Sequence, residues 1–278
     1  MKTTCFLFLA LLTGLAALRA ESLTDLAAGL DSPQPAVRLA AVRSLALDYP
    51  KESIPRMLRA FEDTDPLVRE RAVQALGVSG GPEHIAALRN ALDDPVWYVR
   101  WRSLQALQRL GARDLGGSAD ALTADESWQV RASLYELAGD ILAGTLRQAS
   151  REKQVEIPAR GLLIRGLADR DERVCLAAAG ALARNHDTTA LEPLLGLLKD
   201  GSLFTRDGAA LALGVLGDKS AVPALIEALA DPRNEASDEG RDWARWGVVK
   251  ALMALSGKDF GLDEAKWREW MEAGNGKK

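Results

Sequence analysis

Residues Pro66 to Gly77 read PLVRERAVQALG, and variants of this stretch recur along the chain at a nearly fixed interval. Each copy can be aligned on one reference residue, which is Val68 in this copy. The reference residues are Val37, Val68, Val99, Val130, Val174, Thr205 and Ala244. The first four stand 31 residues apart, and the later steps of 44, 31 and 39 residues indicate two insertions. Self-similarity at such a period is the signature of a repeat protein, so we predict seven structural units.

The apolar residues of each copy follow the period of a helix. Counted from the reference residue, positions 0, 4, 7 and 8 lie on one helical face, and alanine and leucine dominate them. A second apolar segment precedes each copy, as in IPRMLRAFED at 54–63 and LEPLLGLLKD at 191–200. Two helices of about 12 residues and two short turns account for the period. The sequence therefore predicts a helical hairpin in every repeat.

Charged residues recur at two further positions of the repeat. An arginine follows the reference residue in six copies, and Cys175 takes its place in the seventh. An acidic residue precedes the reference by five positions in six copies: Asp63, Asp94, Asp125, Asp169, Asp200 and Glu239. Because the acids recur together with the bases, we interpret the pairs as a structural Asp–Arg ladder and not as a phosphate grip. We expect the acid also to cap the second helix of its hairpin.

This pattern, D-x(4)-V-R-x(3)-A-x(2)-A-L-G, resembles the HEAT repeat, in particular the short bacterial form named after phycobilisome lyases. The resemblance covers nearly all of residues 22–256 and implies an all-α fold, an α-α superhelix of about seven helical hairpins. It also implies that the second helices line a concave surface. The tail GKDFGLDEAKWREWMEAG resembles that of other exported HEAT proteins, and we expect its tryptophans to cover the open end of the last repeat. We assign the solenoid to residues 21–256 and the C-terminal cap to 257–278.

The N-terminus has the pattern of a secretory signal. Lys2 precedes an uncharged apolar run from Cys5 to Leu18, and small residues follow it. The run has 14 residues and is shorter than the roughly 20 needed to span a bilayer, so we expect no stable membrane insertion. We predict that residues 1–20 are a signal peptide, cleaved after Ala20, and that the protein is periplasmic or secreted.

Charge and cysteine content exclude some classes of function. Loss of Lys2 and Arg19 leaves 33 basic against 39 acidic residues, a formal charge of −6, which disfavours nucleic acid as a partner. Cys175 is the cysteine that remains, so no intrachain disulfide is expected after cleavage.

Motifs of catalysis or metal binding are weak in this sequence. The stretch 77–81, GVSGG, matches G-x-S-x-G, but it follows a predicted helix where a nucleophile elbow needs a strand. His84 and His186 lack the spacing of a zinc site. We therefore expect no cofactor, no metal and no enzymatic activity. A lyase-like enzyme with Cys175 or an acidic residue active remains an alternative hypothesis.

Aromatic residues gather in the third and fourth repeats. The stretch 93–111, DDPVWYVRWRSLQALQRLG, combines Trp, Tyr and Arg as protein-binding hot spots do. The predicted partner-binding residues are Trp97, Tyr98, Trp101, Arg102, Gln105 and Trp128. The alternative interpretation is that these rings fill gaps between helices. The leading hypothesis is an exported scaffold or adaptor that engages a protein of unknown identity through its concave face, and glycan or peptidoglycan binding is a further alternative.

Overall fold

The computed structural model describes residues 22–149, 158–234 and 243–275, and every regular element among them is helical. The chain forms two compact units, Met1–His84 and Ile85–Lys278, which are treated separately below. Within the described ranges, no helix has the length and apolar character needed to cross a membrane. The predicted signal peptide at residues 1–20 lies outside the described residues.

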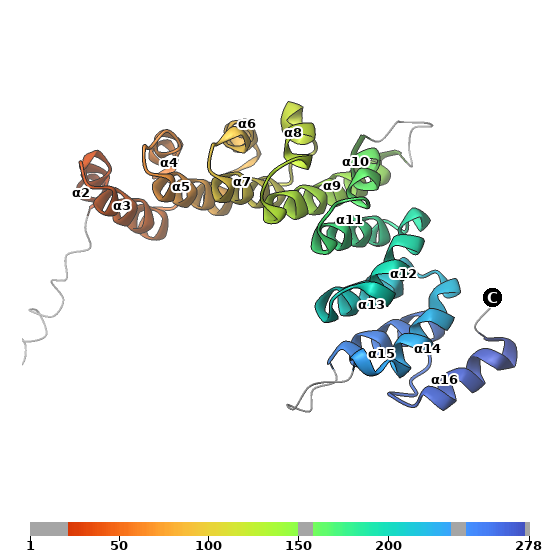
Figure 1. Ribbon diagram of the computed structural model, residues 1–278. Helices are drawn as coiled ribbons and strands as arrows, with labels where there is room; N and C mark the ends of the chain where they lie inside the picture. The colour runs from red at the N-terminus through yellow and green to blue at the C-terminus, as the bar shows by residue number, and fades with distance from the viewer. Residues whose placement is uncertain (1–21, 150–157, 235–242, 276–278) are drawn as a thin grey trace, which may run out of the picture. The chain divides into compact units, whose positions relative to one another are not determined.

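The first unit contains two helical hairpins (Figure 1). The first hairpin pairs α2 (Leu23–Ala28), extended by the 3-10 turn η1 (Gly29–Asp31), with α3 (Pro35–Asp48). The second pairs α4 (Ile54–Ala60) with α5 (Pro66–Ser79), and α5 packs against α3. Their facing sides bury apolar positions that the repeat pattern predicts, among them Ala41, Leu45 and Val68.

The second unit contains five further hairpins, which gives the seven repeats expected from the sequence. The first helices are α6 (Ile85–Asn90, continued by η3, Ala91–Asp93), α8 (Ala119–Thr123), α10 (Pro158–Gly166), α12 (Leu191–Asp200) and α14 (Val222–Ala230). The second helices are α7 (Trp97–Arg109), α9 (Trp128–Ala149), α11 (Glu172–Arg184), α13 (Leu203–Leu216) and α15 (Trp243–Ser256). Short 3-10 turns precede most first helices: η2 (Pro82–His84), η4 (Gly116–Ser118), η5 (Thr188–Ala190) and η6 (Lys219–Ala221), while η7 (Pro232–Asn234) follows α14. This arrangement confirms the predicted all-α solenoid.

Small residues let the second helices of adjacent repeats approach closely. A Cβ atom added to Gly139 of α9 would stand 2.7 Å from the Cβ of Ala181 in α11. A Cβ added to Gly214 of α13 would stand 2.9 Å from the Cα of Ala251 in α15. Each glycine therefore lies where its backbone meets the next helix, and any larger residue there would push the two helices apart.

The Asp–Arg ladder predicted from the sequence is present. The guanidinium of Arg131 donates to both carboxylate oxygens of Asp169 in the next repeat, from Nε at 2.7 Å and from Nη2 at 2.9 Å. Its Nη1 donates to the backbone carbonyl of Asp125 in its own repeat at 2.7 Å. Three other described pairs follow the same plan across repeats: Arg38–Asp63, Arg100–Asp125 and Arg206–Asp231. Each rung thus joins two successive hairpins through a charge-assisted contact.

Two details of the ladder differ from the expectation. The ladder acid does not cap the second helix directly: Asp63 accepts from the N–H of Asp65 two residues on, and Asp65 is the helix cap, accepting from Leu67. In the last rung the acid is Asp231 and not the predicted Glu239, because the insertion falls after this aspartate. Glu239 itself lies outside the described residues.

The C-terminal helix α16 (Glu264–Trp270), followed by the short π-helical turn η8 (Met271–Asn275), packs on α14. Trp267 is fully buried, and its indole Nε1 donates to the carbonyl of Gly261 at 2.9 Å. Its ring meets Phe260 and Trp270 with centroid separations of 4.8 and 6.2 Å. This aromatic cluster covers α14, the first helix of the last repeat, as the sequence predicted.

Candidate functional site

The second helices of the second unit lie along its inner side (Figure 1). A hollow of about 470 Å³ opens over three neighbouring second helices, α9, α11 and α13, and we call it the trough. Its floor is Leu176, Ala177 and Gly180 of α11, and its walls are Trp128 and Glu136 of α9 and Phe204, Leu211 and Val215 of α13. Arg173 and Arg184 lie at the two ends of the floor. The trough is therefore built from repeats four to six.

One wall of the trough is an apolar stripe. Phe204, Leu211 and Val215 are 64%, 38% and 48% exposed, although they are large and hydrophobic. They are spaced by seven and four residues on α13, so they form a straight row along one helical face. Clustered exposed apolar side chains mark interaction surfaces more often than single ones do. Trp246, on the next second helix α15, is also exposed, to 47%.

The opposite wall and the ends carry charge. The guanidinium carbon of Arg173 stands 3.8 Å from the centroid of the Trp128 ring, a cation–π contact between α11 and α9. Arg173 also holds Asp171, with Nη2 and Oδ2 2.7 Å apart, and this hydrogen bond lowers the pKa of the Asp171 carboxyl. Burial raises the pKa of the Glu136 carboxyl on the α9 wall, and the nearby Arg184 opposes that shift.

The junction between α11 and α13 differs from its neighbours in the ladder. Cys175 stands where the other repeats carry arginine, and its Sγ donates at 3.0 Å to the carbonyl of Asp169, the acceptor equivalent to that used by Arg131. Burial raises the pKa of the Cys175 thiol, which keeps it protonated at neutral pH. A hydrogen bond between these repeats comes from Glu172, whose carboxylate accepts from the N–H of Ser202 at 3.0 Å. The trough thus straddles a junction that lacks an arginine rung.

Restoring the missing rung is expected to stabilise the protein. In Cys175→Arg, the guanidinium can donate to the Asp169 carbonyl and to the carboxylate of Asp200, the ladder acid of the next repeat. We expect a gain of about 1 kcal/mol in the free energy of unfolding, since part of the pairing energy is spent on desolvation. Urea titration followed by circular dichroism measures this gain. Cys175→Ser is the matched control, and an equal midpoint for the two variants would refute the expected rung.

Five of the six predicted partner-binding residues lie together on α7. The ring of Trp97 is 5.7 Å from that of Tyr98 and 6.4 Å from that of Trp101, centroid to centroid. Arg102 lies over Trp101, with its guanidinium carbon 4.6 Å from the ring centroid, and its Nη1 donates to Gln105 at 2.9 Å. All five are partly exposed. We call these five residues the α7 cluster.

The sixth predicted residue, Trp128, lines the trough. The sequence interpretation missed the apolar wall formed by Phe204, Leu211 and Val215. A signal for it was present, because these side chains occupy positions −1, 6 and 10 of their repeat, which face away from the packed side of the helix. Apolar residues at such positions in one repeat stand out against polar ones such as Gln74, Gln105 and Glu136 in others.

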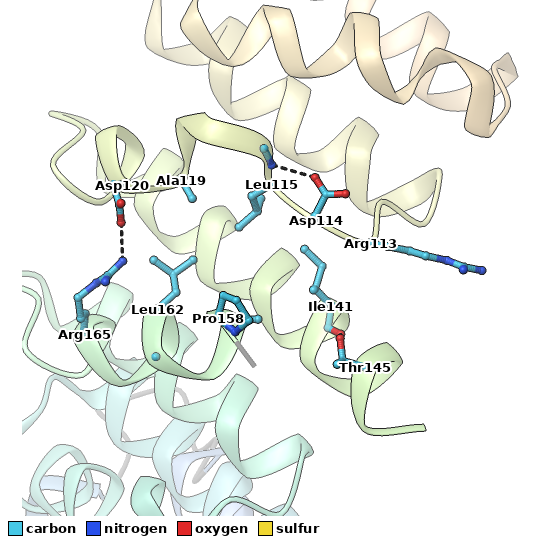
Figure 2. A pocket seen from close by; sticks show the side chains of 13 residues that line it. Arg113, Asp114, Leu115, Ala119, Asp120, Ile141, Thr145, Pro158, Leu162 and Arg165 are labelled. Atoms are coloured by element: carbon cyan, nitrogen blue, oxygen red, sulfur yellow. Dashed lines mark hydrogen bonds and ion pairs between the residues drawn. The ribbon is translucent and has the colours of Figure 1, made fainter. Parts of the chain in front are cut away.

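A second hollow, of about 620 Å³, lies between α8, α9 and α10 (Figure 2). Leu115, Ile141, Pro158 and Leu162 line it, and the ion pair of Asp120 with Arg165 spans its edge at 2.6 Å. Residues 150–157, which precede Pro158 in the chain, lie outside the described residues. This hollow therefore carries no functional assignment.

The weak chemical motifs have structural roles. Ser79 of the 77–81 stretch is the last residue of α5, and Gly80 is the C-cap, as expected for a helix end. His84 accepts from the N–H of Gly81 through Nδ1 at 3.0 Å, which holds the turn that follows. Among the described residues, no group of three or more His, Cys, Asp or Glu side chains is arranged to hold a metal ion.

Helical hairpins stacked through their second helices, with a hollowed and partly apolar inner side, define an α-solenoid repeat protein. The HEAT repeats family matches residues 23–108 and 161–239, more than half of the chain. The chain belongs to this family.

Solved structures of similar fold come from several kinds of protein. Kap95p, in a complex with RanGDP, is 14% identical with a TM-score of 0.59, and the match covers 90% of this chain and 38% of that one. An engineered protein is 20% identical with a TM-score of 0.50, over 91% of this chain and 72% of that one. The phycocyanin lyase CpcE–CpcF complex from Nostoc sp. PCC7120 is 23% identical with a TM-score of 0.49, over 91% and 94%. No curated protein sequence matches the chain. At these identities the likeness concerns the fold alone.

Proposed function

We propose that this protein is an exported, non-enzymatic HEAT-repeat scaffold that binds a protein partner through the concave side of its second unit. The observation that carries the proposal is the apolar wall of the trough, formed by Phe204, Leu211 and Val215. These side chains are exposed to water unless a partner covers them. Export rests on the signal pattern of residues 1–20.

The α7 cluster and Trp128 are the proposed anchors at one end of this surface. Rigid aromatic rings bury much area at little cost in conformational entropy, and Trp, Tyr and Arg dominate binding hot spots. Trp101 and Arg102 already lie against each other, so their side chains are partly ordered before a partner arrives. Trp128 links this end to the trough, because α9 lies between α7 and α11.

A crosslinking pull-down from the extracytoplasmic extract of the source organism tests the proposal. We expect the full chain to retain a specific protein that the double variant Trp101→Ala/Arg102→Glu loses, while both remain equally helical. Lys199→Glu, a charge reversal on the exposed side of the first helix α12, is the control and should retain the partner. Recovery of the same proteins by all three forms would refute the α7 cluster as an anchor. In the same preparation, mass spectrometry of the exported chain should find Glu21 as its first residue.

A further inference from the structure

We propose that the trough receives an amphipathic helix of about three turns, with an acidic flank, from the partner protein. This inference rests on the proposed function and adds the shape and charge of the segment that is bound. It is carried by four observations: the length of the floor, the open space above Gly180, the straight apolar wall and the balance of charge.

The dimensions of the trough suit a helix. Arg173 and Arg184 mark the ends of the floor and are 11 residues apart on α11, a length of about 16 Å. Neighbouring helices pack with their axes about 8–10 Å apart, so the axes of α9 and α13, on either side of α11, stand about 16–20 Å from each other. A guest helix, about 10–12 Å across with its side chains, can therefore lie on α11 and contact α9 and α13 on its two sides.

The middle of the floor is open. A Cβ atom added to Gly180 would meet Nη1 of Arg184 at 3.7 Å and no other described atom within 4 Å. With Ala177 one turn before it, Gly180 leaves a strip without large side chains along the centre of the trough. A guest helix can therefore approach the backbone of α11 closely, as the second helices approach one another elsewhere in this unit.

A helix is favoured over an extended peptide because of what the trough offers the backbone. Its three sides are helices, whose main-chain N–H and C=O groups bond within each helix, so no free sheet edge is present among the lining residues. An extended guest would leave its own main-chain groups without partners beside an apolar wall, whereas a helix satisfies them internally. The row of Phe204, Leu211 and Val215, spaced by seven and four residues, runs along one face of α13 and can contact the apolar face of a guest helix that lies beside it.

Charge assigns the flank of the guest. Among the residues that line the trough, Arg173 and Arg184 are basic and Glu136 is acidic. This excess of base contrasts with the net charge of −4 of the whole chain. Arg184 is exposed at the end of the floor, where its charge acts on Glu136, and its guanidinium can also bind a carboxylate of the guest.

Selection of peptides against the full chain tests the inference. The probe is a phage-displayed library of 16-residue peptides, with a helix-forming frame in one half and a proline-containing extended frame in the other. We expect the selected peptides to come from the helical half, with apolar residues at helical spacing and a net negative charge. Enrichment of extended or basic peptides would overturn the proposal, and so would the absence of any enrichment.

Three variants locate the bound peptide. Gly180→Trp fills the floor and should weaken binding of a selected peptide at least about 20-fold, measured by fluorescence anisotropy. Gly196→Trp is its matched control, because Gly196 is an exposed glycine of the first helix α12 with open space around it, and binding should not change. Arg184→Glu should weaken an acidic peptide about 10-fold, the loss expected for one charge-assisted contact.

The outcomes separate the two proposals. One outcome is a peptide that binds Gly180→Trp as tightly as the unaltered chain but fails to bind Trp101→Ala/Arg102→Glu. This result would refute the trough as the binding site and leave the scaffold function in place. A partner that the pull-down never captures would remove the scaffold function, whatever the peptides do.

Discussion

Arg131→Ala is expected to lower the free energy of unfolding by about 3 kcal/mol, because it leaves a buried carboxylate without its partner. The side chains of Arg131 and Asp169 are 4% and 7% exposed, and three guanidinium nitrogens of Arg131 are engaged. Loss of the guanidinium also leaves the Asp125 carbonyl without its donor. Urea unfolding of the full chain, followed by far-ultraviolet circular dichroism, measures the effect.

A matched control for this variant is present on the surface of the same unit. Arg165 and Asp120 form an ion pair of similar length, 2.6 Å, but their side chains are 59% and 86% exposed. Exposed pairs contribute little, so Arg165→Ala should cost at most about 0.5 kcal/mol. If the two alanine variants unfold at the same urea concentration, the ladder does not stabilise the fold, and the repetition of its geometry along the chain needs another explanation.

The seven hairpins could be predicted because the information is repeated. The apolar face, the arginine and the aspartate return in successive copies, so an error in one copy is corrected by the others. The ladder was predictable for the same reason. Its last rung was not, because the alignment moved the acid position past the insertion to Glu239, whereas the turn that follows α14 keeps Asp231 in place.

The candidate site is harder to predict than the fold because it depends on departures from the repeat. The tryptophans of α7 attract notice by residue type, and the sequence places them on the concave side. The trough instead depends on the small size of Ala177 and Gly180 and on apolar residues in a single copy, α13. The pattern that all repeats share predicts neither the small residues of α11 nor the apolar residues of α13. Cys175 is a similar departure: the sequence shows that it replaces the arginine, but not that its thiol takes over the hydrogen bond to the Asp169 carbonyl.

Trp267→Ala is expected to have the largest effect on stability of any single change in the C-terminal cap. Trp267 is 0% exposed, and replacement of a buried tryptophan by alanine costs about 3–5 kcal/mol. A solenoid unfolds in units that contact only their neighbours, so this cost should appear first as opening of α16 and α14. Amide hydrogen exchange should therefore rise in α14 and much less in the distant α7.

Two further substitutions separate packing from hydrogen bonding at this end. Trp267→Phe keeps an aromatic ring in contact with Phe260 but removes the Nε1 donor to the Gly261 carbonyl. It should therefore lower the free energy of unfolding by about 1 kcal/mol more than the smaller side-chain volume alone would. Trp270→Ala removes a partly exposed ring and should raise exchange in α14 less than Trp267→Ala does. Unchanged exchange in α14 of Trp267→Ala would show that α16 adds no protection to the last repeat. In that case the apolar end of the solenoid must be stable by itself, and the tail would be free to serve another purpose.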